Sequence, residues 1–388
     1  MGLGFLLKIC KEICLFKIGY RNKSEFASKL KKMVINGGPV LIKYIQLLLL
    51  NNYLNKDKNL DYLIVLKDVE DNVYPPDKCE IVRVLGQPFI VKRGQSISCG
   101  SIAYAYEVCI ENNQEVSYIL KKTHNNIKEA VFNSYSLLHS SLSFLPSSYN
   151  LLDASNKLLK LMMEQTDMQR EKQMLIKFEQ VFKDVPKVHI PKVIMVDNEQ
   201  LLMTKEKGVH FDAFVHKYPH HKEEIAHLLF GCIHRMISKN VVHGDFHKGN
   251  FLLFEEKGEV HVSILDFGLV FELTDEQKEH FLDYLEMNQS EDLIKLINTF
   301  VENDIKEDIP IEKLKSKYGH KGDIYNVQDL CKQFNIKLPL EMLHFISALT
   351  LLNYISYGLN TNHLGKNIVK SNLYKNAMDY MIKNYFVD

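Results

Sequence analysis

Apolar residues recur at helical spacing through roughly the first ninety residues of the chain. Repeated steps of three and four residues indicate one face of an amphipathic helix. Gly and Pro punctuate the segment and set the ends of the helices. The predicted helices cover residues 26–34, Val40 to Leu50 after the turn at Gly37-Gly38-Pro39, Leu60 to Val69, and, beyond Pro75-Pro76, a short segment that ends at Gly86.

The pattern changes from helical to β-prone at Gly94. Residues 102–108 and 116–120 are rich in β-branched and aromatic residues, and a polar turn from Glu111 to Gln114 separates them. Such runs on either side of a polar turn predict an antiparallel hairpin. The other predicted elements are helices over residues 127–182, strands at 193–196 and 200–204, a helical stretch to Lys239, a hairpin of 251–254 with 260–265, and helices from Thr274 onward.

The order of these elements predicts the fold class. A small β-containing lobe followed by a mainly helical lobe, with one hairpin inside the latter, is typical of an α+β, bilobal protein-kinase-like fold. The expected parts are a helical N-terminal extension over residues 1–92, an N-lobe over 93–205 and a C-lobe over 206–388. Because one fold serves many activities, the function has to be argued from the site.

Charge and cysteine content narrow the class of protein. Lys and Arg together number 48, as do Asp and Glu, so no net basic charge favours nucleic acid as a partner. The 7 cysteines are scattered without a C-x-x-C pair. This favours a reducing, intracellular and cytoplasmic setting over a disulfide framework. No uninterrupted apolar run reaches about 18 residues, so the sequence predicts no transmembrane segment.

The first segment of the chain has two interpretations. Residues 2–10 are mostly apolar, and lysines stand at positions 8, 11 and 17. Its periodicity predicts an amphipathic helix docked on the rest of the protein. The alternative is a peripheral membrane contact, in which the apolar residues enter the interface and Cys10 or Cys14 is acylated.

A catalytic constellation stands in the second half of the chain. Residues 241–250 read VVHGDFHKGN, and one predicted hairpin later residues 264–268 read ILDFG. Phosphoryl transfer depends chiefly on positioning and on neutralisation of phosphate charge by Mg²⁺. Asp266 and Asn250 offer the hard oxygen ligands that Mg²⁺ prefers. Asp245 is expected to orient or deprotonate an attacking hydroxyl group or water.

The residues around these ligands receive supporting roles. Gly268 is expected to allow the sharp turn after Asp266. His243 is expected to support the backbone of the loop, and His247 to stabilise the loop or contact phosphate. An alternative interpretation joins His243, Asp245 and His247 as zinc ligands. The histidines at positions 216, 220 and 221 are predicted to lie in a solvated loop.

A lysine on an N-lobe strand is expected to reach the α and β phosphates of ATP. Lys121, at the end of the run Tyr118 to Lys121, is the preferred candidate, with Lys122 as the alternative. Because strand side chains alternate, one face of the strand receives one of the two lysines. Glu171 is the preferred helix glutamate to hold that lysine.

These pieces together resemble the UbiB/AarF family of atypical kinases. Lys43 and Gln46, which follow Gly38-Pro39, are similar to the family's N-terminal Lys/Gln motif. Residues 98–102, SCGSI, stand where the family has an alanine-rich loop. Residues 165–167 with Glu171 resemble its Glu-x-Asp segment, and residues 243–250 resemble its catalytic loop. The chain departs from the family pattern at Ile45, Gln165, Gly244, Phe246 and Lys248.

The resemblance implies a site and an activity. It implies an extension folded over the active site, with Lys43 and Gln46 directed into it. Ser98, Gly100, Ser101, Lys121 and His247 are then expected to contact nucleotide. It also implies binding or hydrolysis of Mg-ATP rather than ready phosphorylation of proteins, and a connection to a lipid or isoprenoid small molecule.

The segment after Asp266 agrees with that implication. Residues 274–277, TDEQ, predict a capping box that opens a helix. The segment therefore has no long activation loop, which is the element with which conventional protein kinases hold a peptide. Two alternatives to the UbiB/AarF-like kinase or ATPase stay open. One is a small-molecule phosphotransferase of the aminoglycoside or choline kinase kind, and the other is an ATP-binding pseudokinase scaffold.

Overall fold

The computed structural model describes residues 2–46, 76–111, 113–144 and 148–287, and these form two units. Unit 1 comprises the described residues up to Lys172 together with Val193–Lys205. Unit 2 comprises Gln173–Lys192 and the described residues from Glu206 onward. The boundary at residue 172 falls inside helix α6 (Met168–Phe182), so this helix contributes to both units. The division into extension, N-lobe and C-lobe at residues 92 and 205 stays a prediction.

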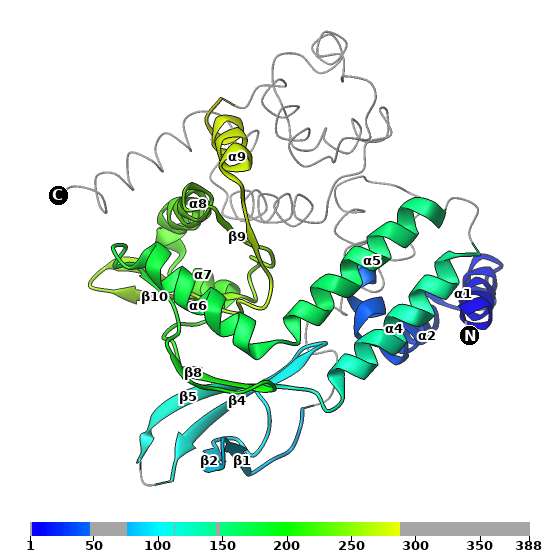
Figure 1. Ribbon diagram of the computed structural model, residues 1–388, viewed down its shortest axis with the longest axis horizontal. Helices are drawn as coiled ribbons and strands as arrows, with labels where there is room; N and C mark the ends of the chain where they lie inside the picture. The colour runs from blue at the N-terminus through cyan, green and yellow to red at the C-terminus, as the bar shows by residue number, and fades with distance from the viewer. Residues whose placement is uncertain (1, 47–75, 112, 145–147, 288–388) are drawn as a thin grey trace. The chain divides into compact units, whose positions relative to one another are not determined.

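Unit 1 is built on a seven-stranded antiparallel sheet (Figure 1). Its strand order is β1-β2-β4-β5-β8-β7, and β3 pairs with β4 at one end. The predicted hairpin of β4 and β5 and the predicted strands β7 and β8 are confirmed. The strands are β1 (Ile81–Val84), β2 (Gln87–Val91), β3 (Ser98–Cys99), β4 (Ala103–Ile110), β5 (Asn113–Thr123), β7 (Val193–Val196) and β8 (Gln200–Thr204).

The short helix predicted to end at Gly86 is wrong. Residues 81–91 instead form a tight hairpin, in which Val84 pairs with Gln87. The two turn residues, Leu85 and Gly86, both have positive φ angles, +48° and +84°. Two successive residues of this kind make a turn whose twist matches that of an antiparallel pair. Val82 and Val84 alternate into the core of the sheet, which helical periodicity in so short a segment does not reveal.

Helices of unit 1 pack on one another beside the sheet (Figure 1). The docked helix expected for the first segment is confirmed, because α1 contacts α4 and Ser141 Oγ donates a hydrogen bond to the Gly2 carbonyl at 3.3 Å. Glu12 of α1 is almost buried and accepts a 2.7 Å hydrogen bond from Arg21 Nε. The helices are α1 (Gly2–Lys17), α2 (Lys23–Asn36), α4 (Ile127–Leu142) and α5 (Ser148–Gln165).

The predicted helix after Pro39 is present over residues 39–46, and the remainder of its predicted range lies outside the described residues. Val40 and Leu41 enter a core formed with α4 and α5. The Leu41 amide donates to Ser134 Oγ of α4 at 3.2 Å, which ties the start of this helix to α4. Burial raises the pKa of Tyr44 to about 12, so this side chain packs as a neutral phenol. The candidate helix over residues 60–69 lies outside the described residues.

Unit 2 combines short sheets with helices. β10 and β11 form the predicted hairpin, and β6 adds to β11 in parallel. β12 pairs with β9 in a separate antiparallel pair. Helix α8 buries most of its apolar residues against this part of the chain. The elements are β6 (Val188–His189), α7 (Phe211–Lys217), the short helix η2 (Pro219–His221), α8 (Lys222–Ser238), β9 (Val241–His243), β10 (Phe251–Glu256), β11 (Glu259–Ile264), β12 (Val270–Glu272) and α9 (Asp275–Met287).

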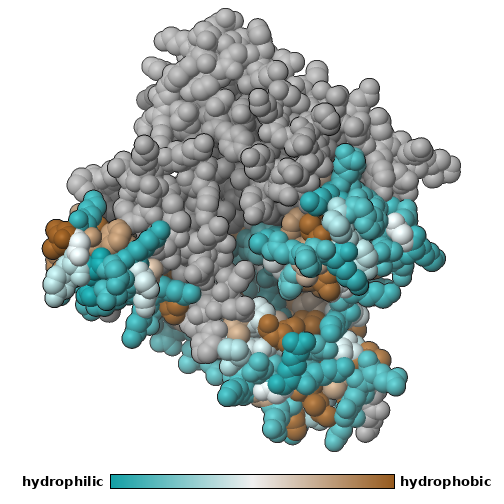
Figure 2. All heavy atoms as spheres, turned by 180° about the vertical axis from the view of Figure 1, so that it is seen from behind, coloured by the Kyte–Doolittle hydropathy of each residue, from teal (hydrophilic) through white to brown (hydrophobic). Residues whose placement is uncertain are grey.

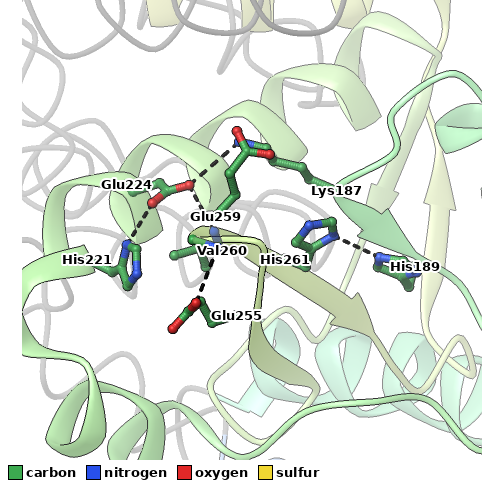
Figure 3. Close-up of polar contacts among 9 residues, drawn as sticks. Lys187, His189, His221, Glu224, Glu255, Glu259, Val260 and His261 are labelled. Carbon is green, nitrogen blue, oxygen red and sulfur yellow. Dashed lines mark hydrogen bonds and ion pairs between the residues drawn. The ribbon is translucent and has the colours of Figure 1, made fainter.

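A buried lysine organises the junction of β6, α8 and β11 (Figure 3). Lys187 Nζ lies 2.9 Å from Glu259 Oε1 and 3.6 Å from Glu224 Oε1. Glu224 also accepts from the Val260 amide at 2.9 Å and bonds to His221 Nδ1 at 2.8 Å. The solvated-loop prediction is wrong, because His216 lies in α7 and both His220 and His221 lie in η2. His221 is also almost buried.

On the face shown in Figure 2, the described residues are mostly hydrophilic, and hydrophobic residues gather in small patches. On α1, Leu3 and Leu7 are 49% and 61% exposed. None of the helices described is both long and apolar enough to cross a membrane. The alternative of a peripheral membrane contact through α1 stays a prediction.

The turn of the first hairpin gives a stability prediction. A left-handed conformation costs an ordinary L-residue about 1–2 kcal/mol, whereas Asn tolerates it and Asn-Gly favours this turn. We expect Leu85→Asn to raise the free energy of unfolding by about 1 kcal/mol, as measured by urea denaturation. Leu85→Ala is the matched control, because it removes the same exposed side chain without the left-handed preference. Equal stability of the two variants would contradict this account of the turn.

A pair of histidines gives a pH prediction. His189 Nε2 and His261 Nδ1 lie 3.1 Å apart (Figure 3), so one ring donates and the other accepts. Burial lowers the pKa of both rings, and the ring that accepts must be neutral. The charged groups that act on the pair are Glu206, Lys207, Lys187, Glu256 and Glu259.

Because the folded pKa values lie below the ordinary histidine value of about 6.5, protons bind the unfolded chain more readily. The stability contributed by the pair is present above that value and is lost as the pH falls through the folded pKa values. We expect the free energy of unfolding to fall between pH 7 and pH 5, and to fall less steeply in His261→Gln. His216→Gln, at an exposed histidine, is the control and should keep the slope of the wild type. If the free energy of unfolding depended on pH equally in His261→Gln and the wild type, the histidine pair would not be the source of the pH dependence.

Candidate active site

The predicted catalytic loop begins at strand β9 and ends at strand β10 in unit 2. The β10–β11 register places Phe251 opposite Ile264, and the Leu265 amide donates to the Asn250 carbonyl at 2.8 Å. The hairpin therefore brings Asn250 beside the segment that carries Asp266. Pairing of β10 with β11 therefore brings together Asn250 and Asp266, the two candidate metal ligands, although they are far apart in sequence.

His243 holds this loop from inside the unit. The side chain is fully buried, and Nε2 donates to the Leu265 carbonyl at 3.0 Å. Nδ1 accepts from the Asp245 amide at 3.2 Å, so both ring nitrogens are used and the tautomer is fixed. Burial lowers the pKa of His243, which keeps the ring neutral, as its accepting nitrogen requires. A ring with both nitrogens engaged in this way is not a zinc ligand, which argues against the zinc interpretation.

Asn250 and His247 are held by the backbone of the same loop. Asn250 Nδ2 donates to the Asp245 carbonyl at 2.9 Å, an arrangement that turns the amide oxygen away from that contact. His247 Nδ1 accepts from the Gly249 amide at 3.1 Å. His247 Nε2 lies 3.4 Å from Asn250 Nδ2 and 3.7 Å from Asp245 Oδ2. The loop thus fixes the donors around Asp245 through its own hydrogen bonds.

Asp266 has an unusual backbone conformation. Its φ angle is +57°, in the left-handed region, and its Oδ1 accepts from the Gly268 amide at 3.2 Å. The turn expected at Gly268 is therefore made by Asp266 itself, while Gly268 supplies an amide. A non-glycine residue in this conformation costs about 1–3 kcal/mol and persists where the surroundings impose it. Strain of this kind is frequently found at functional sites.

The aromatic residue after Asp266 packs on helix α6. The rings of Phe267 and Phe178 lie 4.8 Å apart and edge to face, and Phe178 also contacts the ring of His243. The sequence analysis did not select Phe178. The available signal was its place seven residues after Glu171 on the same predicted helix, a spacing that puts two residues on one face. Within unit 2, Phe178 links α6 to both ends of the candidate site.

Gly244 is a departure from the family loop that the packing explains. A Cβ atom at this position would lie 2.4 Å from Phe271 Cε2 and 2.8 Å from Leu269 Cγ. Phe271 belongs to β12, whose pairing with β9 fixes it opposite Val242. The bulk of Phe271 therefore requires glycine next to Asp245. The departure at Lys248 makes a different contact, a 2.9 Å ion pair with Asp212 on the exposed surface of α7.

Unit 1 holds a separate pair of predicted site residues. Lys121 Nζ donates to both carboxylate oxygens of Glu171, at 2.8 and 2.9 Å. Their side chains are 17% and 2% exposed. Asp167 caps α6 by accepting from the Gln169 amide at 3.0 Å, which sets where Glu171 stands on the first turn. The catalytic role of Lys121 and Glu171 stays a prediction, but the structure brings the two side chains together.

Lys122 lies on the opposite face of strand β5. It stands across from Tyr104 of β4, whereas Lys121 stands across from Ala105. Successive strand residues point to opposite faces. Glu171 therefore selects Lys121 from the two lysines that the sequence left open.

The other nucleotide-contact candidates also belong to unit 1. Ser98 lies in β3 and pairs with Ala105 of β4. The Gly100 amide donates to the Ala103 carbonyl at 3.0 Å, and the Gly100 carbonyl bonds to His124 Nε2 at 2.8 Å. Ser101 lines a cavity beside this loop. Lys43 and Gln46 lie on the helix of residues 39–46 and are partly buried. Their roles toward nucleotide stay predictions.

The segment after Asp266 is short. β12 begins four residues later and pairs with β9, and α9 begins at Asp275. The predicted capping box is confirmed, because the Gln277 amide donates to Thr274 Oγ1 at 3.1 Å and the Thr274 amide donates to Gln277 Oε1 at 3.0 Å. No activation loop intervenes between Asp266 and α9, a stretch that is described throughout.

Comparison with known proteins identifies the class and then the family. Residues 85–300 match the ABC1 atypical kinase-like domain. The class is therefore an atypical kinase-like protein with a protein-kinase-like fold, in which one unit holds the lysine–glutamate pair and the other holds the loop and the Asp-Phe-Gly segment. The match covers more than half of the 388 residues, and the chain belongs to the ABC1 atypical kinase-like family. The resemblance to the UbiB/AarF group is confirmed by this match.

Two solved structures have some likeness to the chain at low sequence identity. The Rv3197–erythromycin complex from Mycobacterium tuberculosis is 15% identical, with 67% of this chain and 73% of that chain covered and a TM-score of 0.47. The Rio2 kinase–ADP/Mg²⁺–phosphoaspartate complex from Chaetomium thermophilum is 16% identical, with 77% of each chain covered and a TM-score of 0.31. No curated protein matches the chain.

The packing around Gly244 gives a prediction. We expect Gly244→Ala to lower the free energy of unfolding by about 1–3 kcal/mol, the usual cost of overpacking, in chemical denaturation. Gly100→Ala is the control, because a Cβ atom there would make an ordinary 3.5 Å contact. The double variant Gly244→Ala with Phe271→Ala should recover part of the loss attributed to Gly244→Ala in a double-mutant cycle. Additive losses in that cycle would show that Phe271 is not the obstacle.

Proposed function

We propose that the protein is a Mg-ATP-dependent atypical kinase or ATPase of the UbiB/AarF type that acts on a small molecule or lipid. The observation that carries the proposal is the geometry of the catalytic loop. Hydrogen bonds of His243 and Asn250, together with the β10–β11 hairpin, hold Asp245 and Asp266 within one unit. Such preorganisation is what phosphoryl transfer asks of a protein.

The donor atoms fit a hard divalent cation. Asn250 Nδ2 is engaged by the Asp245 carbonyl, so its Oδ1 is the atom available to a cation. Asp266 contributes a carboxylate whose Oδ1 is oriented by the Gly268 amide. Two oxygen ligands of this kind, completed by phosphate oxygens and water, are the usual set for Mg²⁺. When bound, Mg²⁺ supplies neutralisation of phosphate charge.

The remaining site residues bind, orient and move protons. Asp245 accepts the proton of an attacking hydroxyl group or water, and His247 Nε2 lies 3.7 Å from its Oδ2. Lys121 is assigned to the α and β phosphates of ATP, with its ammonium group held by Glu171. Lys43, Gln46 and the loop of Ser98, Gly100 and Ser101 are assigned to nucleotide contacts on the basis of the family.

The class of acceptor follows from the segment after Asp266. Conventional protein kinases use an activation loop there to hold a peptide. Here β12 and the capping box of α9 follow within a few residues, which supports a small-molecule or lipid acceptor over a polypeptide. A phosphotransferase of the aminoglycoside or choline kinase kind is the second candidate, because Gly244 gives the loop a His-Gly-Asp sequence and is fixed by Phe271. ATP-dependent phosphorylation of a hydroxylated small molecule would favour that candidate.

The metal site gives the test of the proposal. A ligand that binds the native state alone raises stability by about 2.7 kcal/mol at a hundredfold excess over its dissociation constant. We expect millimolar Mg-ATP to raise the Tm of the wild type, and expect that rise to be lost or blunted in Asp266→Asn. The same variant should also lose slow ATP hydrolysis.

The control is Asp283→Asn, at an exposed aspartate of α9 that belongs to the same unit. It should keep the full rise in Tm. ATP without Mg²⁺ should give a smaller rise than Mg-ATP in the wild type. No rise in the Tm of the wild type with Mg-ATP would contradict the proposal. Binding of ATP without hydrolysis would favour the pseudokinase scaffold instead.

A further inference from the structure

Unit 1 contains a cavity on the face of the sheet that is opposite to the Lys121–Glu171 pair. Its volume is about 370 Å³, which is within the range of small-molecule sites. Tyr104 and Lys122 stand opposite each other on β4 and β5 and line it together. Lys121 alternates to the other face. The cavity is therefore distinct from the predicted nucleotide contacts of Lys121.

The walls of the cavity are aromatic and fixed in place. The rings of Tyr104 and His124 pack edge to face at 4.3 Å, and Tyr106 follows at 6.2 Å from Tyr104. His124 Nε2 donates to the Gly100 carbonyl at 2.8 Å, and Tyr106 donates to Asp77 Oδ2 at 2.5 Å. A planar ring can pack against such a wall at little cost in side-chain ordering, because the rings are already held.

The charges around the cavity leave one cation without a partner. Asp77 accepts the Tyr106 hydroxyl, and burial raises the pKa of both Tyr104 and Tyr106, so the tyrosines are neutral. Burial also lowers the pKa of His124, which keeps that ring neutral near pH 7. Lys122 is half-buried and has no hydrogen-bond or ion-pair partner among the residues that the structure describes.

The remaining lining residues divide into polar and apolar groups. Ser101 and Asn125 supply hydrogen-bonding groups near Lys122, and the first turn of α4 supplies an apolar floor through Ile127 and Ala130. The ammonium group of Lys122 favours a carboxylate or phosphate group. The carboxylate of Asp77 in the same lining accepts the Tyr106 hydroxyl. An aromatic and aliphatic wall favours a ring attached to that group.

We propose that this cavity binds a small aromatic anion, a ring that carries a carboxylate or phosphate group, with the anionic group on Lys122 and the ring against Tyr104. The proposal is independent of the proposed kinase or ATPase activity. It assigns different ligands to two consecutive lysines, because β5 directs them to opposite faces of one sheet.

The test uses the full chain with phenyl phosphate as the probe. Binding is measured by isothermal titration calorimetry in the absence of nucleotide. We expect saturable binding that Lys122→Met weakens by at least about tenfold, the effect of losing a hydrogen bond to a charged group. Neutral benzyl alcohol should bind at least about tenfold more weakly than phenyl phosphate to the wild type, for the same reason. Lys122→Met should keep the rise in Tm with Mg-ATP, because Lys122 has no part in the proposed nucleotide site.

Lys121→Met is the matched control, since it removes the neighbouring ammonium group from the other face. It should bind phenyl phosphate like the wild type and lose the response to Mg-ATP. No saturable binding at probe concentrations up to about 10 mM, a dissociation constant weaker than which would mean a binding free energy below about 2.7 kcal/mol, would overturn the proposal. Equal binding of phenyl phosphate by Lys122→Met and the wild type would also overturn it.

Discussion

The buried ring of His243 is the constraint on which the candidate site of unit 2 depends. One nitrogen donates to Leu265, the residue before Asp266, and the other accepts from the amide of Asp245. A single neutral side chain therefore fixes the spacing of two carboxylates that would otherwise repel each other. Because both bonds lie inside the unit, away from water, losing either would leave a buried polar group unsatisfied, which costs about 1–3 kcal/mol. Both hydrogen bonds therefore favour one position of the loop.

The pair of Lys121 and Glu171 is organised in a similar way within unit 1. Both side chains are largely removed from solvent, and the capping of α6 by Asp167 fixes the turn that carries the glutamate. Helix α6 then continues into unit 2, where Phe178 packs on Phe267. One helix thus supplies a charged residue to one unit and an aromatic residue to the other. Burying an ion pair is costly unless both partners are well placed, and here two hydrogen bonds from the ammonium group meet that condition.

Much of the fold was predictable because local patterns decided it. The β4–β5 hairpin, the strands β7 and β8 and the capping box of α9 are each set by alternation, turn residues or side-chain caps within a few residues. The loop of residues 243–250 could be recognised because phosphoryl transfer requires particular residue types at that spacing. Glu171 could be selected because it lies within the amphipathic stretch of residues 163–182.

Other features depend on contacts that a single sequence does not display. The strands β6, β9 and β12 have only two or three residues each and exist because of distant partners. The first hairpin was taken for a helix because Leu85 is an unusual residue for a left-handed turn. Alternation alone also left Lys121 and Lys122 undecided, since the sequence does not say which face meets α6. Gly268 seemed the natural turn residue, yet the backbone turns at Asp266.

The left-handed backbone of Asp266 has a consequence for how such a protein can change. Asn and Gly adopt that conformation more easily than Asp, so a population selected for thermal resistance alone would drift toward either residue at this position. Either change would improve folding while discarding the carboxylate. In a library of variants, higher stability would then accompany loss of the candidate metal-binding carboxylate at position 266. A screen that scores expression or heat tolerance would enrich for inert proteins unless it also scored nucleotide turnover.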